Sequence, residues 1–366
     1  MQKKIIALAV AGLMSGAAFA QSNVTVYGIV DAAYVDLSTN NTLAASVKSK
    51  RGIDSSGLQT SRLGFRGTED LGGGLKANFV LEYTLVNDAN RAIGGGAAAL
   101  ARQQTIGLSS NSWGAFNLGR MLTLTGAHNS RYAALFGTGL SPEGQVRGAS
   151  GTGWDYANRV SNTAAYVSPN MSGFNVAVAR VFGVAENGAT AGEIKSNDGT
   201  TVARQTGWDM TANYAAGPVG VGLAYQRIGN TSAAGNTAGT RQTTLGGSYD
   251  LGVVKLMANY TNFKTEVAND KRGKGYSLSA VAPVTATGNV HFSYATSKGT
   301  DNALSEGAKS WALAYTHGLS KRTTAYVGYS TADAKSGSTA TFYGNTNLVE
   351  LDKKARLIAA GLSHSF

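Results

Sequence analysis

The stretch Leu75–Val86, LKANFVLEYTLV, alternates between two kinds of side chain. One parity is entirely apolar: Leu75, Ala77, Phe79, Leu81, Tyr83 and Leu85. The other parity is polar apart from one valine: Lys76, Asn78, Val80, Glu82 and Thr84. Because successive side chains of a β-strand point to opposite faces, the pattern predicts a strand with one apolar face and one face that carries charges of both signs.

The same alternation recurs along the whole chain, for example in Thr206–Ala216, Val219–Arg227 and Ser310–His317. We predict about 16 strands, near residues 24–37, 58–68, 75–86, 101–110, 114–121, 157–168, 173–183, 206–216, 219–228, 241–251, 253–264, 273–283, 288–298, 307–318, 323–332 and 355–366. The connections alternate between short turns and long polar loops; the loops include Ser38–Gly57, a third loop at Thr123–Tyr156, and Asp333–Lys353. This layout is typical of an all-β fold, a transmembrane antiparallel β-barrel, and about 16 strands leave an aqueous lumen.

The composition agrees with a polar-lined barrel. The 366 residues include 48 glycines, 4 prolines and no cysteine, and only 14% are charged. The formal net charge of +11 falls to +9 without Lys3 and Lys4, which lie in a segment expected to be removed. Since the basic residues are scattered and form no Lys/Arg-rich run, nucleic acid is not an expected partner. The basic excess instead favours anions in a pore.

The N-terminal stretch Met1–Ala20, MQKKIIALAVAGLMSGAAFA, has the three parts of a secretory signal peptide. Lys3 and Lys4 precede an apolar run, and Ala18–Ala20 forms an A-x-A cleavage site. The apolar run is short for a membrane-spanning helix. We therefore expect residues 1–20 to be cleaved, and residues 21–366 to form one exported barrel domain.

Signatures of catalysis and cofactor binding are weak. The four histidines, His128, His291, His317 and His364, lack the paired spacing of a metal site. Gly72–Gly74 falls in a predicted hairpin turn rather than between a strand and a helix, so it does not indicate a phosphate site. No G-x-S-x-G elbow occurs. We expect no enzyme activity, no metal and no cofactor.

Four stretches resemble the trimeric general porins of Gram-negative bacteria, in particular those of β-proteobacteria. They are VTVYGIVDAAY (Val24–Tyr34), SRLGFRGTEDLGGGLKANFVLEY (Ser61–Tyr83), NRVSNTAAYVSPNMSGFNVAVA (Asn158–Ala179) and GLSHSF (Gly361–Phe366). With the strand rhythm, the resemblance covers the mature chain. It is specific at the two hairpins and the C-terminus, and loose in the long loops and the second half. It implies an outer-membrane homotrimer whose third loop folds into the lumen.

The resemblance also implies a pore constriction. Arg62, Arg102 and Arg159 match a basic cluster on the wall, Glu82 matches a carboxylate beside it, and Glu143 in SPEG matches the acid of the third loop. By parity, Arg62 and Glu82 should face water, and Arg159 lies opposite Val160 and Tyr166. The parity of Arg102 is ambiguous, because it is shared by Ile106 and Leu108.

The third loop departs from the family pattern because it is poor in acid. It holds Glu143 and Asp155, which are accompanied by Arg131 and Arg147. Its apolar patch Ala133–Phe136 suggests that the loop packs on the barrel interior. For each arginine the alternative is an exposed residue at the rim or in a loop.

Together these features predict an outer-membrane general diffusion porin, a water-filled channel for ions and small hydrophilic solutes that favours anions. One alternative is a substrate-specific channel on the same barrel, and another is a soluble, secreted, β-rich adhesin. Outer-membrane lipid would surround the barrel. The C-terminal Phe366 can be read as the lipid-facing end of the last strand or, by resemblance, as the signal read by the barrel assembly machinery.

Overall fold

A computed structural model describes residues 23–40, 49–89, 93, 101–146, 158–182, 204–231, 237–266, 271–299, 307–334, 340–342, 346–349 and 354–366. The predicted signal peptide, with the new N-terminus Gln21, and the loop residues Arg147 and Asp155 lie outside these ranges. Among the helices of the described ranges, none combines the length and the apolar character needed to cross a bilayer.

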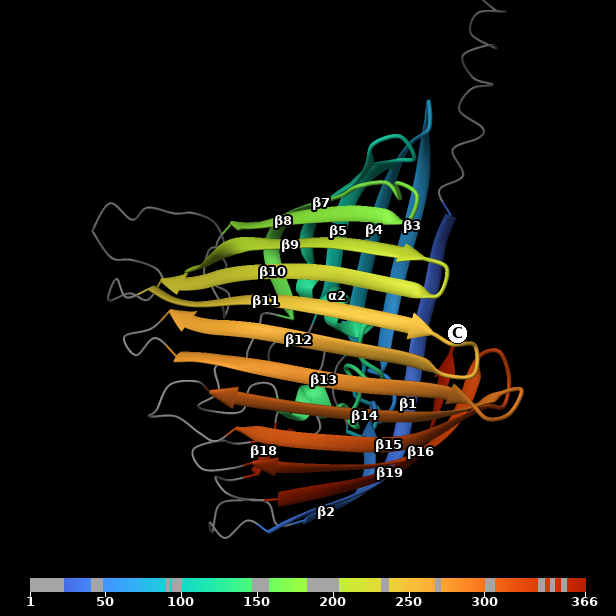
Figure 1. Ribbon diagram of the computed structural model, residues 1–366. Coiled ribbons are helices and arrows are strands. Elements are labelled where there is room, and N and C mark those ends of the chain that lie inside the picture. The colour runs from blue at the N-terminus through green and yellow to red at the C-terminus, as the bar shows by residue number, and fades with distance from the viewer. Residues whose placement is uncertain are drawn as a thin grey trace, which may run out of the picture.

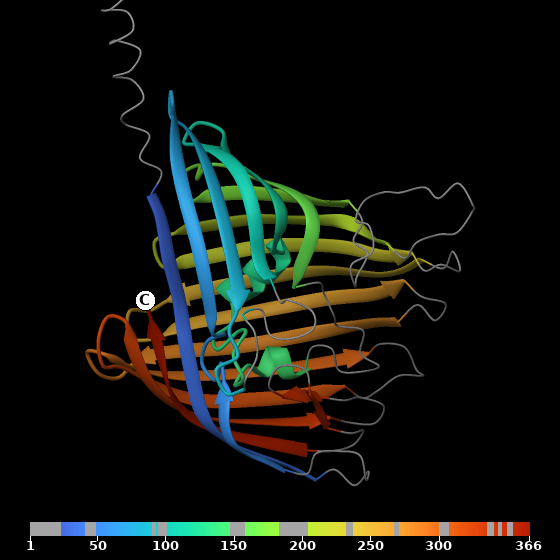
Figure 2. The same cartoon turned by 180° about the vertical axis from the view of Figure 1, so that it is seen from behind.

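The strands form a closed antiparallel barrel, seen from two sides in Figures 1 and 2. They are β1 (Asn23–Thr39), β2 (Ser49–Ser55), β3 (Arg62–Gly72), β4 (Leu75–Thr84), β5 (Ala101–Ser110), β6 (Gly114–Leu122), β7 (Arg159–Val167), β8 (Phe174–Phe182), β9 (Arg204–Ala216), β10 (Val219–Thr231), β11 (Thr237–Asp250), β12 (Lys255–Glu266), β13 (Lys271–Pro283), β14 (Gly288–Gly299), β15 (Ala308–Gly318), β16 (Thr323–Ala334), β17 (Ala340–Phe342), β18 (Thr346–Val349) and β19 (Lys354–Ser365). From β3 to β16 each strand pairs with the next one in sequence, β16 pairs with β19, and β19 pairs with β1 from Ile29↔Ser365 to Thr39↔Ala355. This last pairing closes the wall.

The main sheet holds 17 strands, but two of them share one position in the wall. β3 pairs with the first half of β1, from Asn23↔Thr68 to Ile29↔Arg62, and β2 pairs with the second half, from Ala32↔Ser55 to Ser38↔Ser49. The closed wall therefore has the 16 strand positions that the alternation predicts. The prediction of a loop over Ser38–Gly57 is wrong for residues 49–55, since β2 continues the ladder there.

The predicted loop at Asp333–Lys353 also contains regular structure, because β17 and β18 form a small separate hairpin. Both this hairpin and β2 escaped prediction for one reason. An apolar outer face is needed only where a strand meets hydrocarbon, and beyond that height backbone pairing alone holds the ladder. Across β1 and β2, for instance, the side chains that meet are charged: Arg51 Nε lies 3.1 Å from Asp36 Oδ2.

The two faces of the wall differ as the alternation predicts. On β15, Trp311 and Leu313 are 40% and 49% exposed on the outside, whereas Ala312 and Ala314 are buried inside. Farther round, hydroxyl and amide side chains such as Thr244, Thr261 and Ser277 face inward and are buried. Outward apolar side chains suit a hydrocarbon solvent, and the polar inner face suits water.

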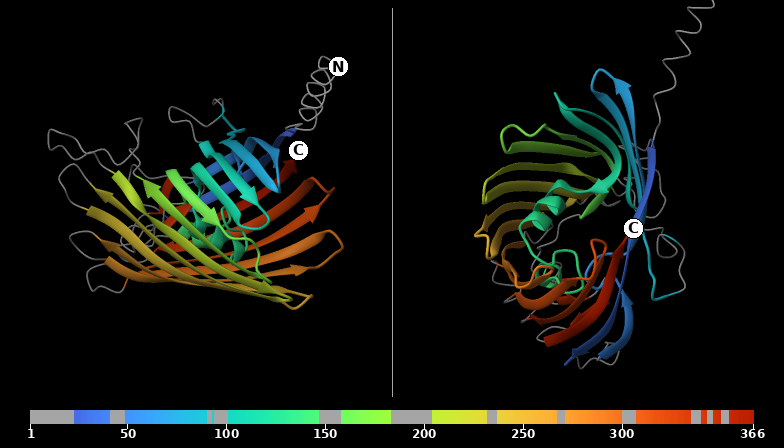
Figure 3. Two further views of the ribbon diagram at one scale, coloured as in Figure 1. Left: turned by 90° about the horizontal axis from the view of Figure 1, so that it is seen from above. Right: turned by 90° about the vertical axis from the view of Figure 1, so that its right-hand side faces the viewer.

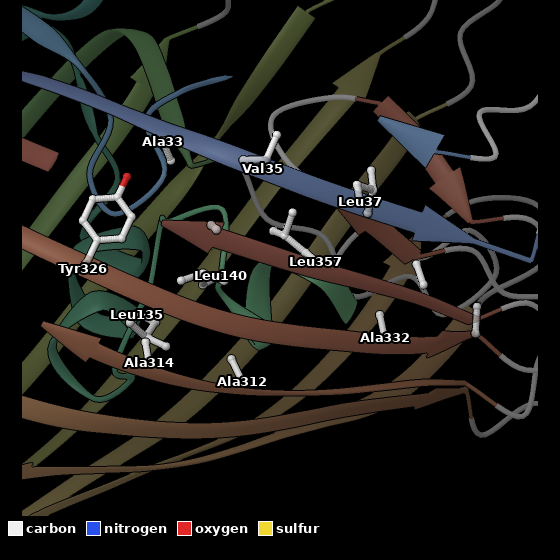
Figure 4. Packing of buried hydrophobic residues seen from close by; sticks show 13 residues of the cluster. Ala33, Val35, Leu37, Leu135, Leu140, Ala312, Ala314, Tyr326, Ala332 and Leu357 are labelled. Carbon is white, nitrogen blue, oxygen red and sulfur yellow. The ribbon is translucent and has the colours of Figure 1, made fainter. Parts of the chain in front are cut away.

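The third loop fills part of the lumen. It contains α2 (Leu124–Arg131) and α3 (Pro142–Val146), and Figure 3 shows both inside the ring of strands. α2 contacts β9 and β10, and α3 contacts β14, β15 and β16. Leu135 and Leu140 of this loop join an apolar cluster with inward side chains of β1, β15, β16 and β19 (Figure 4). The loop's own apolar residues thus find the buried surface that its sequence suggests.

Candidate pore constriction

Glu82 on β4 is the centre of a charged cluster on the inner wall. Arg102 Nε donates to Glu82 Oε1 at 2.6 Å, and the Tyr27 hydroxyl donates to Oε2 at 3.0 Å. Arg62 Nη1 lies 3.9 Å from Oε1. Glu82 is 4% exposed, so this carboxylate is largely removed from water and is held by charged and phenolic donors.

A β-bulge aims Arg102 at Glu82. In the pairing of β4 with β5, Glu82 lies opposite Gln103 and Tyr83 lies opposite Ala101, so Arg102 is the extra residue. An extra residue reverses the alternation locally and can turn a side chain to the other face. This explains why parity left Arg102 ambiguous: Ile106 and Leu108 are outward, and Arg102 shares their parity but not their direction.

Arg159 and Arg120 extend the cluster. The charges of Arg102, Glu82, Arg120 and Arg62 all lie close enough to act on Arg159, at the start of β7. Arg120 Nε donates to the Ala101 carbonyl at 2.6 Å, and its Nη1 donates to Ser161 Oγ at 2.9 Å. The structure therefore brings together Arg62, Arg102, Arg159 and Glu82, each of which the resemblance implied.

Sequence reasoning missed two members of this cluster, Tyr27 and Arg120. By parity Arg120 belongs with the outward Phe116 and Leu118, but the register of β6 against β7 shifts between Gly119 and Met121. Gly119 adopts φ of 127°, a conformation that favours glycine. A glycine directly before an arginine is the one local sign of this irregularity, and it does not by itself indicate a functional residue.

The first half of the third loop is anchored on β9. The side chain of Thr123 caps α2 by accepting from Gly126 N at 3.0 Å. Thr125 then donates to Asp209, from its backbone nitrogen at 3.2 Å and from Oγ1 at 2.6 Å. Asp209 is 1% exposed on the inner face of the wall. A buried carboxylate held by these donors fixes the start of α2.

Glycines make room for the next anchor, Tyr132, at the end of α2. A Cβ atom on Gly246 would lie 2.2 Å from Tyr132 Cδ2, and one on Gly222 would lie 3.0 Å from its hydroxyl. Tyr132 is 1% exposed. Burial raises the pKa of its phenol and lowers the pKa of the neighbouring His128 to about 4. The glycines of β10 and β11 thus form a seat for the aromatic end of α2.

The second half of the loop is anchored on the opposite wall. Gln145 Nε2 donates to Ser330 Oγ at 2.7 Å, and Ser310 Oγ donates to Gln145 Oε1. Ser297 Oγ donates to the Val146 carbonyl at 3.1 Å. Because these bonds reach three strands, β14 to β16, α3 is held across a broad area of wall.

Glu143 does not lie in the arginine cluster. It is 2% exposed, and its Oε2 accepts from Ser277 Oγ on β13 at 3.3 Å. The charges that act on Arg62 and Arg159 are those of Glu82, Tyr27 and other arginines. The resemblance located this residue in the chain, but the direction of a side chain on a five-residue helix depends on packing. Arg131 lies exposed at the end of α2.

Phe366 completes the closure of the barrel. Its nitrogen donates to the Gly28 carbonyl at 3.1 Å, and its carbonyl accepts from Gly28 N at 3.2 Å. Its ring lies against Gly28, where a Cβ would come within 2.4 Å of Cζ, and 44% of the residue is exposed on the outside. Phe366 and β1 therefore lie together at the place where the barrel closes.

The constriction carries more positive than negative charge. Three guanidinium groups, those of Arg62, Arg102 and Arg159, lie around one carboxylate, Glu82, in the described part of the cluster, and Arg120 lies beside Arg159. Guanidinium stays charged at all accessible pH values. In a narrow water-filled passage between low-dielectric walls, such an excess attracts anions and repels cations.

Known proteins agree with this architecture. Residues 7–337 match a family model described as Gram-negative porin. The chain is 38% identical to outer membrane porin protein 32 of Delftia acidovorans, over 93% of this chain and 92% of that protein. It is 30% identical to an outer membrane porin protein of Bordetella pertussis, over 100% of both chains.

Solved structures show the same barrel. An anion-selective porin from Comamonas acidovorans matches with a TM-score of 0.78 at 30% identity, over 94% of this chain and 100% of that chain. OmpF of Salmonella typhi in complex with daunomycin matches with a TM-score of 0.66 at 19% identity, over 94% of this chain and 98% of that one. The second likeness concerns the fold alone. The chain belongs to the Gram-negative porin family of the outer membrane.

Proposed function

We propose that this protein is a general diffusion porin that passes ions and small hydrophilic solutes and favours anions. The observation that carries the proposal is the cluster of Arg62, Arg102 and Arg159 around Glu82, with Arg120 beside Arg159, in a barrel narrowed by the third loop. Solutes would move down their gradients, and no catalytic step would be involved. The Comamonas protein, which shares 30% of its sequence with this chain, is described as anion-selective.

Export and assembly belong to the same proposal. Residues 1–20 would be cleaved as a signal peptide, and the barrel assembly machinery would recognise the C-terminal strand that ends in Phe366. The barrel would form a homotrimer, as general porins do by resemblance. A structure of OmpT from Vibrio cholerae, 15% identical to this chain, is described in a trimer form.

Planar-bilayer recording of the purified wild-type protein tests the proposal. For a general diffusion pore, conductance should rise in proportion to KCl concentration, because ions cross without occupying a saturable site. Under a KCl gradient, the reversal potential should have the sign of chloride permeation. Conductance that saturates with a particular solute would favour a substrate-specific channel. A reversal potential of the opposite sign would contradict the anion preference.

A further inference from the structure

The chain leaves the wall of the barrel between β2 and β3. β2 ends at Ser55, β3 begins at Arg62, and Asp31 lies between the two parts of β1 that pair with these strands. We call the connecting residues, Ser56–Ser61, the inner turn. Because no residue of β2 or β3 stands opposite Asp31, its backbone groups need other hydrogen-bond partners on this side of β1.

Ser61 takes the place of the missing strand residue. Its Oγ accepts from Asp31 N at 2.9 Å and donates to the Asp31 carbonyl at 3.0 Å. Ser56 N donates to the same carbonyl at 2.8 Å. The first and the last residue of the inner turn are therefore both fixed to β1.

The carboxylate of Asp31 holds the middle of the inner turn. Gln59 N donates to its Oδ2 at 2.9 Å, and Leu58 N donates to the same oxygen at 3.2 Å. The hydroxyl of Tyr326, on β16, donates to Oδ1 at 2.6 Å. Asp31 is 0% exposed. A buried carboxylate with these donors makes strong, charge-assisted hydrogen bonds, so the backbone at Leu58 and Gln59 is held in one place.

The inner turn lies on the lumen side of the wall. Leu58 packs against the apolar cluster that the third loop shares with inward side chains of the wall. The Gly57 carbonyl accepts from Gly139 N of the third loop at 3.2 Å. The inner turn and the third loop therefore adjoin each other inside the barrel, and both occupy part of the lumen.

Gln59 is the one exposed residue of the inner turn, and it lies beside the constriction. Its Oε1 accepts from Arg62 Nη2 at 3.4 Å, while Arg62 Nη1 lies 3.9 Å from Glu82 Oε1. Since the amide oxygen faces Arg62, the amide nitrogen of Gln59 is turned away from it, and no acceptor of the described residues occupies this nitrogen. An amide held in this way presents N–H donors to the water of the lumen.

We propose that Gln59 is a selectivity-determining residue of the pore, whose amide donates to anions as they pass Arg62. The inference rests on the proposed anion preference and adds a neutral hydrogen-bond donor to it. An anion beside Arg62 exchanges a water of its hydration shell for the amide N–H. A cation at the same place finds no acceptor on Gln59, because the amide oxygen is bonded to the guanidinium.

Reversal potentials in planar bilayers test this role, with chloride and potassium of a KCl gradient as the probe ions. Q59M keeps the length of the side chain but removes the amide without a change of charge. Q59E places a carboxylate beside Arg62. The matched control is Q104A, which removes an exposed glutamine of the outer face that donates to the Tyr83 hydroxyl. Only inserted barrels conduct, so misfolded protein gives no signal.

We expect the chloride-to-potassium permeability ratio to fall by about twofold or more in Q59M, because a neutral donor is lost. It should fall further in Q59E, since the new carboxylate also offsets the charge of Arg62. Q104A should match the wild type. An unchanged ratio in Q59M would overturn the proposal, even if Q59E lowers the ratio, because charge alone would then set the preference. A wild-type channel that prefers potassium would refute the proposed function, whereas the comparison of Q59M with the wild type would still test Gln59.

The position of Gln59 in the lumen can be tested separately, because the chain contains no cysteine. Q59C should react with a sulfonate-bearing methanethiosulfonate reagent, and the label should lower the single-channel conductance. The control is I53C, at a position of β2 that is 61% exposed and lies opposite outward Tyr34. Its label should leave the conductance unchanged. Unchanged conductance of Q59C, with labelling verified by mass spectrometry, would overturn the placement of Gln59 beside the ion path.

Discussion

At the scale of single residues, Glu82 determines how the constriction arginines are held. It accepts from Arg102 and Tyr27 and lies within ion-pair distance of Arg62. One carboxylate thus organises several cations while leaving the cluster net positive. Parity along the strands predicted that Glu82 and Arg62 face inward. It could not predict Arg102, which is the extra residue of a β-bulge, or Arg120, which lies where the register of β6 against β7 shifts.

Substitution of Glu82 by glutamine should strengthen the anion preference. Glutamine keeps the size of the side chain but removes the only carboxylate of the described cluster. A unit charge next to an ion in water is worth about 1 kcal/mol, so the chloride-to-potassium permeability ratio should rise by up to about fivefold. Reversal potentials in a KCl gradient measure this ratio. An unchanged ratio would show that Glu82 does not act on the permeating ions, and a shift toward potassium would contradict the expected sign.

At the scale of elements, the third loop is fixed to the wall at two distant places. α2 depends on Asp209 and on the glycine seat of Tyr132, and α3 depends on Gln145 and the serines of β14 to β16. The sequence predicted an inward loop from its length and apolar patch. It did not predict these anchors, because a buried Asp209 and a pair of glycines follow the ordinary strand pattern until the loop is placed on them.

The glycine seat can be tested with two adjacent residues of β11. In G246A the new Cβ would lie 2.2 Å from the Tyr132 ring, whereas in G247A the nearest atom is the Gly220 carbonyl oxygen at 3.9 Å. Overpacking of a filled site typically costs about 1–3 kcal/mol. Thermal unfolding followed by circular dichroism should therefore show a lower midpoint for G246A and little change for G247A. Equal midpoints would mean that Tyr132 is not held on this seat.

Acid should loosen the α2 end of the loop. His128 is buried beside Asn213 and near Arg131, and its pKa of about 4 lies below that of a free histidine, about 6.5. The undocked loop therefore binds a proton first as pH falls. His128 contributes its full stabilisation above about pH 6.5 and loses it between about pH 6.5 and 4.

A protease or hydrogen-exchange assay of residues 124–132 across this pH range measures the effect. Asp209 and Tyr132 also titrate and lie against α2, and Arg131 is a fixed charge beside them. The H128N variant separates the contribution of the histidine, because it keeps a polar side chain and cannot titrate. Protection that falls equally in H128N would assign the pH dependence to Asp209 instead.

At the scale of the whole molecule, most of the fold follows from two features: strands with an apolar outer face and a polar inner face, and 16 strand positions in the wall. Both were predicted from the sequence. Its predictions were wrong at β2 and at the hairpin of β17 and β18, because strands without a regular apolar face look like loops in the sequence. Glu143 shows a different limit. The resemblance located this residue in the chain, and the structure buries it against Ser277, a contact that nothing in the sequence predicts.

Phe366 takes part in closing the barrel and, in our proposal, in recognition by the assembly machinery. Folding in vitro and assembly in cells separate these two roles. In F366A the backbone bonds to Gly28 remain available, so folding into detergent micelles in vitro should be retained. Assembly in cells should fall if the terminal aromatic ring is the signal for the assembly machinery. L362A, another outward position of β19, serves as the control. Normal cellular assembly of F366A would refute the signal.

The central claim is that the inward arginines set the ionic preference of a water-filled pore. The most direct measurement is the reversal potential, in a KCl gradient, of a channel that carries R62Q, R102Q and R159Q. The control is R51Q, which removes an arginine paired with Asp36 on the outer face. Only inserted barrels conduct, so misfolded protein gives no signal. We expect the triple variant to shift toward potassium by at least about fivefold in permeability ratio, and R51Q to match the wild type. An unchanged reversal potential in the triple variant would contradict the claim.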